Sequence, residues 1–216
     1  AATAGAGCVL DAVDLSLSGG ALRSFSAVRP PGHHALRASG MGFCLLGNVA
    51  IAAHYARRNK GLDRVLIVDW DVHHGNGTQA LVEQDPSIRF VSMHQWPWYP
   101  GTGPGDDRGP HDNVWNVPMP AARPREEYVS AFLTAVDAAT AGFTPDLVFI
   151  SAGFDSLAGD PLGGFTLEMD DVARLTREMV SRAGQWCGGR VVSALEGGYA
   201  PERLGEAAVT HLKALL

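Results

Sequence analysis

Residues 64–76 read RVLIVDWDVHHGN, and this stretch decides the fold. Its apolar run, 65–68, is continuous rather than alternating, which is typical of a parallel strand whose two faces are both covered. Acidic residues and histidines follow the run at once, from Asp69 to His74. Because ligands of open α/β sheets bind beyond the carboxyl ends of the strands, the stretch predicts a functional site directly after this strand.

Five further apolar runs resemble this strand, and longer segments with helical spacing separate them. The predicted strands span 25–28, 64–69, 88–92, 115–118, 146–151 and 190–195. The predicted helices span 43–58, 126–141 and 168–183, with Gly184 closing the third and Pro201 opening a last helix. This alternation predicts the α/β class, with an open, mainly parallel sheet and helices on both faces. A length of 216 residues suits a single domain over 1–216.

The composition limits the class of protein. Hydrophobic residues make up 46% of the chain and charged residues 19%, and no apolar run is long enough to cross a bilayer, so we expect a soluble protein without membrane contact. The net charge of −6 disfavours direct binding to nucleic acid. Three cysteines without C-x-x-C spacing favour a reducing cytoplasm, and residues 1–15 resemble a helix more than a signal peptide.

Residues suited to metal binding follow two of the predicted strands. Asp71 and His73 are two residues apart, so in extended backbone their side chains emerge on the same face. Asp155, after another strand, can supply a third ligand. Three ligands leave one position open for water, and two carboxylates with one imidazole suit Zn²⁺ but also Fe²⁺. We therefore expect a catalytic metal site at this edge of the sheet.

Residues suited to proton transfer follow two other strands. The tandem His33-His34 stands on a stiff Pro-Pro-Gly turn, and both rings titrate near neutral pH. Asp69 can orient His33, and the uncharged amide of Asn76 can orient His34, so the two rings would differ in basicity. Tyr199, which follows two glycines, can bring a phenol hydroxyl close to the metal as an oxyanion donor.

Six motifs occur in one order along the chain: RPPGHH (29–34), GFC (42–44), DWDVHHGNGTQ (69–79), YPGTG (99–103), SAGFD with DPLGG (151–164) and EGGY (196–199). Together they resemble the signature set of the histone deacetylase superfamily, which includes bacterial acetylpolyamine amidohydrolases and shares its fold with arginase. Asn76 makes the chain more similar to class II and bacterial members than to class I, where an aspartate is usual.

The resemblance implies a zinc-dependent amidohydrolase that cleaves an acyl amide, such as acetyl-lysine, with metal-activated water. It implies His34 as general base and acid, His33 with Asp69 as electrostatic support, and Tyr199 as the oxyanion donor. The implied zinc ligands are Asp71, His73 and Asp155. A structural potassium ion is also implied, with ligands from Asp69, Asp71, His73, Ser92 and Met93.

The substrate is less closely defined than the reaction. Phe43 and Tyr99, with Gly42 beside them, would flank a narrow tunnel for the alkyl stem of an acylated amine. Leu162 stands where polyamine deacetylases of the superfamily carry an acidic gatekeeper. An acyl-lysine or a neutral amide is therefore favoured, and an acetylpolyamine amidohydrolase is the lesser alternative.

Two further alternatives concern the metal count and the start of the chain. Ureohydrolases of the arginase fold hold two Mn²⁺, but His74 and glycine-rich backbone occupy the second-metal positions here, so one catalytic metal is favoured. Family domains also carry two strands before the RPPGHH turn, which are missing here. We expect an exposed edge strand near 25–28, covered by a partner or a second copy of the chain. A truncated acyl-amine-binding scaffold without turnover is the alternative function.

Overall fold

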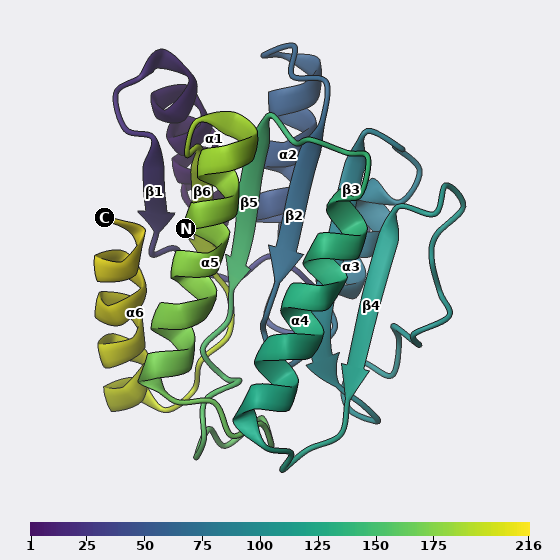
Figure 1. The fold of residues 1–216 in the computed structure, drawn as a ribbon, viewed down its shortest axis with the longest axis vertical. Helices are drawn as coiled ribbons and strands as arrows, with labels where there is room; N and C mark the ends of the chain where they lie inside the picture. Colours follow the sequence, from purple (N-terminus) through teal and green to yellow (C-terminus); the bar gives the residue numbers. More distant parts are fainter.

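A computed structural model describes residues 1–216 and contains one six-stranded sheet in the order β1-β6-β5-β2-β3-β4 (Figure 1). Every neighbouring pair is parallel. The strands are β1 (Arg23–Ser26), β2 (Val65–Asp69), β3 (Ile88–Gln95), β4 (Val114–Met119), β5 (Leu147–Ala152) and β6 (Val191–Leu195). The structure thus confirms the predicted open, parallel α/β sheet.

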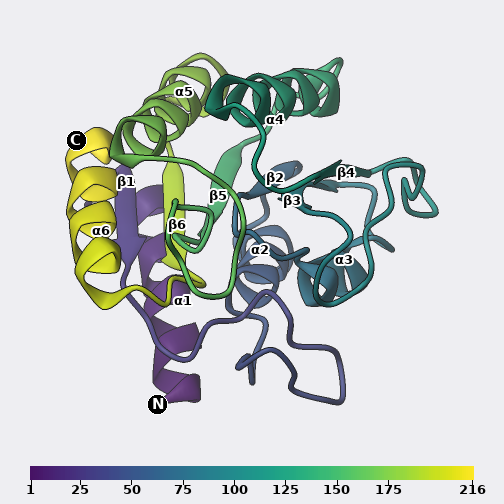
Figure 2. The ribbon, with the colours of Figure 1, turned by 90° about the horizontal axis from the view of Figure 1, so that it is seen from below.

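Helices cover both faces of the sheet, as the continuous apolar strands predict. Figure 2 shows α1, α2 and α3 on one face and α4, α5 and α6 on the other. The helices are α1 (Ala2–Ser18), α2 (Asn48–Arg58), α3 (Asn76–Val82), α4 (Arg125–Thr140), α5 (Met169–Cys187) and α6 (Pro201–Leu215). None of them is both long and apolar enough to span a membrane.

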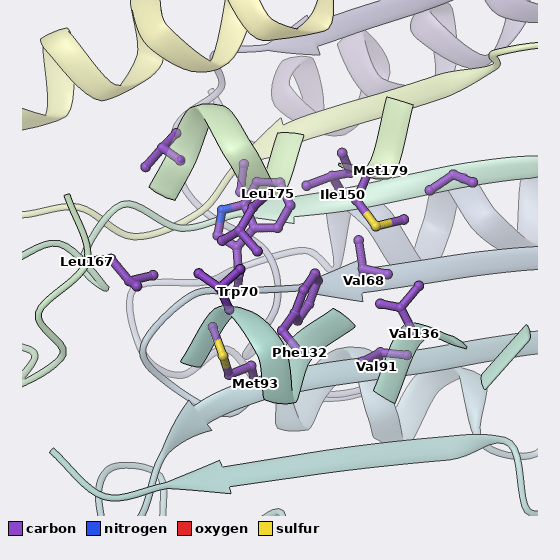
Figure 3. Close-up of a cluster of buried hydrophobic side chains, with 14 of the residues drawn as sticks. Val68, Trp70, Val91, Met93, Phe132, Val136, Ile150, Leu167, Leu175 and Met179 are labelled. Carbon is purple, nitrogen blue, oxygen red and sulfur yellow. The ribbon is translucent and has the colours of Figure 1, made fainter. Parts of the chain in front are cut away.

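The two faces of the sheet give two hydrophobic cores. Along β2, Leu66 and Val68 point into the core under α4 and α5, whereas Val65 and Ile67 point into the core under α1 and α2. This division follows from the two-residue period of a strand. Figure 3 shows the first core, where Phe132 packs beside Trp70 and Val68. Burial of side chains on both faces fixes the position of a strand along the sheet. It therefore also fixes the level at which the strand ends.

Three helices differ from the expected ones, and strand β1 lies two residues before the expected 25–28. The helix expected over 43–58 begins only at Asn48, because the chain turns before it and Phe43 adopts a left-handed φ of 64°. Helix α3 was not expected at all. Helix α5 continues past Gly184 and ends at Gly188, which adopts φ 65° in the left-handed region that suits glycine. Pro201 opens α6 as predicted.

Strand β1 lies at one edge of the sheet, where the sequence places an edge strand. It pairs only with β6, and all four of its residues are half-buried. Its free edge carries backbone groups that a further strand can pair with. A second copy or another partner at this edge stays a prediction.

Replacing Phe132 by Ala should destabilise the fold by about 3–5 kcal/mol, since the phenyl ring is fully buried and its removal leaves a cavity beside Trp70. Urea denaturation measures the free energy of unfolding. Val209→Ala, at a position 51% exposed on α6, is the control and should change stability by less than about 0.5 kcal/mol. Equal effects of the two substitutions would contradict this core assignment.

Candidate active site

The strand registers bring the carboxyl ends of the strands into line. One row across the sheet contains, in spatial order, Ser26, Ala194, Ser151, Asp69 and Ser92. The loops after β1, β6, β5 and β2 begin at this row or one residue beyond it, whereas β3 continues to Gln95. This alignment is the reason that residues as distant in sequence as Asp71 and Asp155 meet in one site.

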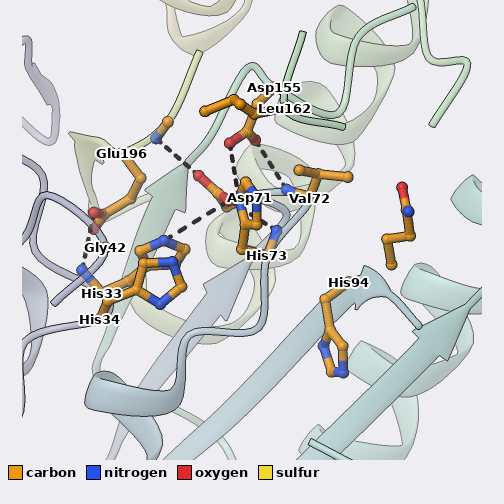
Figure 4. Close-up of polar contacts among 12 residues, drawn as sticks. His33, His34, Gly42, Asp71, Val72, His73, His94, Asp155, Leu162 and Glu196 are labelled. Atoms are coloured by element: carbon orange, nitrogen blue, oxygen red, sulfur yellow. Dashed lines mark hydrogen bonds and ion pairs between the residues drawn. The ribbon is translucent and has the colours of Figure 1, made fainter. Parts of the chain in front are cut away.

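The side chains of Asp71, His73 and Asp155 converge. His73 Nδ1 lies 3.0 Å from Asp71 Oδ1 and 3.1 Å from Asp155 Oδ2. The candidate ligand atoms of the three residues all lie within 4.8 Å of one another, and all three side chains are buried. In Figure 4 these side chains point toward one another, whereas His94 lies apart on β3. The three residues are placed to share one cation.

Backbone amides fix the remaining carboxylate oxygens. Gly197 N donates to Asp71 Oδ2 over 2.8 Å, and Val72 N donates to Asp155 Oδ1 over 2.9 Å. A Cβ on Gly197 would lie 2.1 Å from Asp155 Oδ2, so the loop can approach the carboxylates this closely only as glycine. The two carboxylates are thereby oriented without any contribution from a metal.

The charges of the three residues favour a divalent cation. Hydrogen bonds to Asp155 and Asp71 outweigh burial and raise the pKa of His73 to about 10. Burial and the negative charge of Asp71 raise the pKa of Asp155 to about 7. The cluster thus holds a proton that a cation can replace. Two carboxylates and one imidazole, buried and convergent, fit Zn²⁺ and also accept Fe²⁺.

The tandem histidines have the predicted partners. His33 Nδ1 lies 3.0 Å from Asp69 Oδ2, and His34 Nδ1 lies 2.7 Å from Asn76 Oδ1. Since the Asn76 oxygen accepts, Nδ1 of His34 carries the hydrogen and Nε2 keeps its lone pair. The ring centroids of His33 and His34 are 4.0 Å apart. The pair is therefore close enough for the charge of one ring to affect the other.

The two rings differ in basicity, as the sequence predicts. Burial alone would lower the pKa of His33, but the carboxylates of Asp71 and Asp69 outweigh it and hold the pKa well above its usual value. Burial, followed by the positive charge of His33, lowers the pKa of His34 to about 3. At neutral pH, His33 is charged and His34 is neutral.

A cavity of about 390 Å³ opens beside the cluster. It is lined by His34, Gly42, Phe43, His73, Trp98, Tyr99, Leu162 and Tyr199. All four residues that the resemblance places in the tunnel are among them. The indole Nε1 of Trp98 donates to the Leu162 carbonyl over 2.9 Å and joins two loops at the mouth. The cavity therefore ends on the histidines and is walled mainly by apolar side chains.

Sequence reasoning missed two acidic residues that hold the Tyr199 loop. Asp160 accepts hydrogen bonds from Tyr199 N at 2.7 Å and Leu162 N at 2.9 Å. Glu196 is fully buried and accepts from backbone amides of the RPPGHH turn. Both acids stand inside quoted motifs, and Glu196 directly follows an apolar strand. A position directly after a strand could have indicated a role in the site for Glu196.

Three of the residues implied for potassium, Asp69, Ser92 and Met93, lie on adjacent strands, whereas Asp71 and His73 lie in the loop after β2. Asp69 on β2 is the register partner of Ser92 on β3, and Met93 follows Ser92. The Asp69 carboxylate accepts from Asp71 N at 3.0 Å and contacts His33. His94 on β3 contacts the 99–103 loop instead, since its Nε2 lies 2.8 Å from the Gly103 carbonyl oxygen.

A family model described as "Histone deacetylase domain" matches residues 1–215. The chain belongs to the histone deacetylase family. A crystal structure of the HDA15 HD domain superposes with a TM-score of 0.90 and 39% sequence identity, covering 98% of this chain and 62% of that one. The fold and the motifs thus agree with one family assignment.

Curated relatives of this histone deacetylase family member are longer than the chain. An uncharacterised protein of Synechocystis is 47% identical over 89% of this chain and 62% of its own length. Human polyamine deacetylase HDAC10 is 42% identical over 98% of this chain and 32% of its own length. Rice "Histone deacetylase 10, chloroplastic" is 42% identical over 89% of this chain and 44% of its own length. Because some relatives are named chloroplastic, a cytoplasmic location stays a prediction.

Replacing Gly42 by Ala should displace the His34 ring. The residue adopts φ 53°, and an added Cβ would lie 2.2 Å from His34 Cδ2. Gly61→Ala is the matched control, because Gly61 has a similar φ of 75° with nothing within 4 Å. Both variants carry backbone strain, but only Gly42→Ala should shift the imidazole NMR signals of His34. Unshifted signals in that variant would contradict the packing of this turn.

Zinc binding at neutral pH should release between about one and two protons, because His73 with its pKa of about 10 is protonated and Asp155 with its pKa of about 7 is partly so, and both must be deprotonated to bind zinc. Zinc affinity should therefore rise with pH. Titration calorimetry in buffers of different ionisation enthalpy measures the proton count. His111→Ala, an exposed position, is the control. An affinity that stays constant between about pH 6 and 8 would overturn this assignment.

Proposed function

We propose that this chain is a zinc-dependent deacetylase that hydrolyses an acyl amide on an amine such as the lysine side chain. One observation carries the proposal: a convergent metal-ligand set, a neutral histidine and a tyrosine meet at one cavity. Asp71, His73 and Asp155 would hold the cation, which when bound polarises an acyl carbonyl and makes water more acidic.

His34 is the proposed general base and acid. Its Nε2 lone pair is free, because Nδ1 is bonded to Asn76 and burial keeps the ring neutral at neutral pH. The proposed role of this lone pair is to accept a proton from the attacking water and pass it to the leaving amine. The products are a carboxylate and an ammonium ion, so atoms and charge balance.

His33 is proposed to act by its charge. The carboxylate of Asp69 lies against Nδ1, and His33 stays protonated at neutral pH. Its positive charge adds to burial in lowering the pKa of the neighbouring His34, and it would also stabilise negative charge that forms nearby. The two adjacent histidines thus have different tasks although they share one turn.

Tyr199 is the proposed donor to the developing oxyanion. Burial and the carboxylates of Asp71 and Asp155 raise the pKa of its phenol, so the hydroxyl keeps its proton. A protonated phenol at the end of the cavity can donate a hydrogen bond to the carbonyl oxygen as charge builds on it.

The cavity lining favours an acylated amine whose alkyl stem carries no further charged group. Phe43, Tyr99 and Leu162 supply apolar walls for an alkyl stem, and no aspartate or glutamate lines the cavity. The free ammonium of an acetylated polyamine would find no carboxylate there. We therefore propose an acyl-lysine-like substrate, with a polyamine as the less favoured class. We also propose a structural potassium ion near Asp69 and Ser92.

Tyr199→Phe should lower kcat on an acetyl-lysine peptide by roughly a hundredfold or more, because it removes the oxyanion donor and keeps the ring. Turnover is measured as acetate release from a panel of acetyl-lysine peptides and acetylated polyamines. Tyr55→Phe, on α2 and bonded to Asp14, is the control. Unchanged turnover of Tyr199→Phe would remove this residue from the mechanism. Zinc retention without hydrolysis of any panel member by the unmodified protein would favour the scaffold alternative.

A further inference from the structure

Two turns carry the proposed base and the proposed oxyanion donor, and each sends a side chain onto the backbone of the other. The first turn follows β1 and ends in His34, and the second follows β6 and ends in Tyr199. The strands are neighbours in the sheet, with Ser26 paired to Ala194. We call the side chains of Glu196 and Arg29, with the backbone groups that they contact, the clasp.

Glu196 forms the buried half of the clasp. Its Oε2 accepts hydrogen bonds from Gly32 N at 2.7 Å and His33 N at 3.0 Å, and its Oε1 accepts from Ser151 Oγ at 3.1 Å. Figure 4 shows this carboxylate beside the backbone of the histidine turn. Glu196 is fully buried and does not line the cavity, so it does not contact a substrate there.

The amides that Glu196 binds are the first that follow the two prolines of the turn. Pro30 and Pro31 have no N–H group, so Gly32 and His33 carry the first backbone donors after Arg29. Both donors are buried, and a buried N–H without an acceptor is costly. The glutamate therefore satisfies the turn and fixes its position relative to β6.

Arg29 forms the opposite half of the clasp. Its guanidinium donates to the Glu196 carbonyl at 3.4 Å and to the Gly198 carbonyl at 3.3 Å. Gly198 directly precedes Tyr199, so these contacts reach the backbone that carries the phenol. A planar guanidinium with several donors suits two carbonyl groups of one loop.

We propose that Glu196 and Arg29 are positioning residues that fix the separation between His34 and Tyr199. This inference rests on the proposed function for the roles of those two side chains. Neither positioning residue contacts the reacting atoms. Catalysis by oriented groups is sensitive to displacements of about 1 Å, which can cost about a hundredfold in rate. Loss of the clasp should therefore lower kcat more than it changes KM.

Two substitutions of Glu196 separate the hydrogen bonds from the charge. Glu196→Gln keeps an oxygen for Gly32 and His33 and turns an amide toward Ser151, whereas Glu196→Ala removes every acceptor. We expect Glu196→Ala to lower kcat about tenfold to a hundredfold with KM and zinc content nearly unchanged. Glu196→Gln should retain kcat within about threefold. Loss of turnover in Glu196→Gln with its amides still protected would overturn the proposal, because charge would then be the cause.

Arg29 provides a second variant that does not disturb a buried group. Arg29→Ala should lower kcat at least about fivefold, because the Tyr199 loop loses two donors. Arg37→Ala is the matched control, since Arg37 is exposed and lies outside the cavity. Equal turnover of the two arginine variants would overturn the role of Arg29. If Glu196→Ala does not fold, the comparison of Arg29→Ala with Arg37→Ala still tests the proposal.

Amide hydrogen exchange tests the clasp without any turnover. Exchange at Gly32 and His33 should be faster in Glu196→Ala and unchanged in Glu196→Gln. If the unmodified protein hydrolyses no acyl amide, the proposed function fails, while faster exchange in Glu196→Ala still supports the clasp. If the unmodified protein is active, and Glu196→Ala keeps both its kcat and its exchange rates, the clasp fails and the proposed function stands.

Discussion

Two aspartates, Asp71 and Asp155, are completely buried around the imidazole of His73, and the rest of the site depends on this cluster. Burying two carboxylates together is costly unless each oxygen finds a partner. Backbone amides of Val72 and Gly197 supply part of the compensation, and the imidazole supplies the rest. The two buried carboxylates are therefore stable only with an aligned sheet edge, a glycine at position 197 and a positive charge between them.

The same negative charge sets the chemistry of the neighbouring groups. It holds His33 protonated, while burial, together with the charge on His33, lowers the pKa of His34. Burial, together with the same carboxylates, raises the pKa of Tyr199, so the phenol stays a donor. Burial and one charged cluster thus give a neutral base, a fixed cation and a protonated phenol at a single cavity. The loops that carry these groups are held by hydrogen bonds to backbone, which do not depend on the substrate.

The sheet and the metal-ligand candidates could be predicted because both follow from short-range patterns. Continuous apolar runs mark covered strands, and residues two apart after a strand, such as Asp71 and His73, share a face. Helix α3 could not be predicted, because it is only seven residues long and buries polar Thr78 and Gln79, so it shows no apolar helical pattern. The late start of α2 follows from the left-handed Phe43. Glu196 was missed because its partners are backbone amides more than 160 positions away, which no local pattern indicates.

The proposed function depends most directly on where a divalent cation binds. Anomalous X-ray diffraction from crystals of the zinc-loaded chain, recorded on both sides of the zinc edge, measures that position. We expect one strong peak between the side chains of Asp71, His73 and Asp155, beside the cavity that His73 and Tyr199 line. A peak elsewhere, or zinc-loaded crystals in which these three side chains point apart, would contradict it.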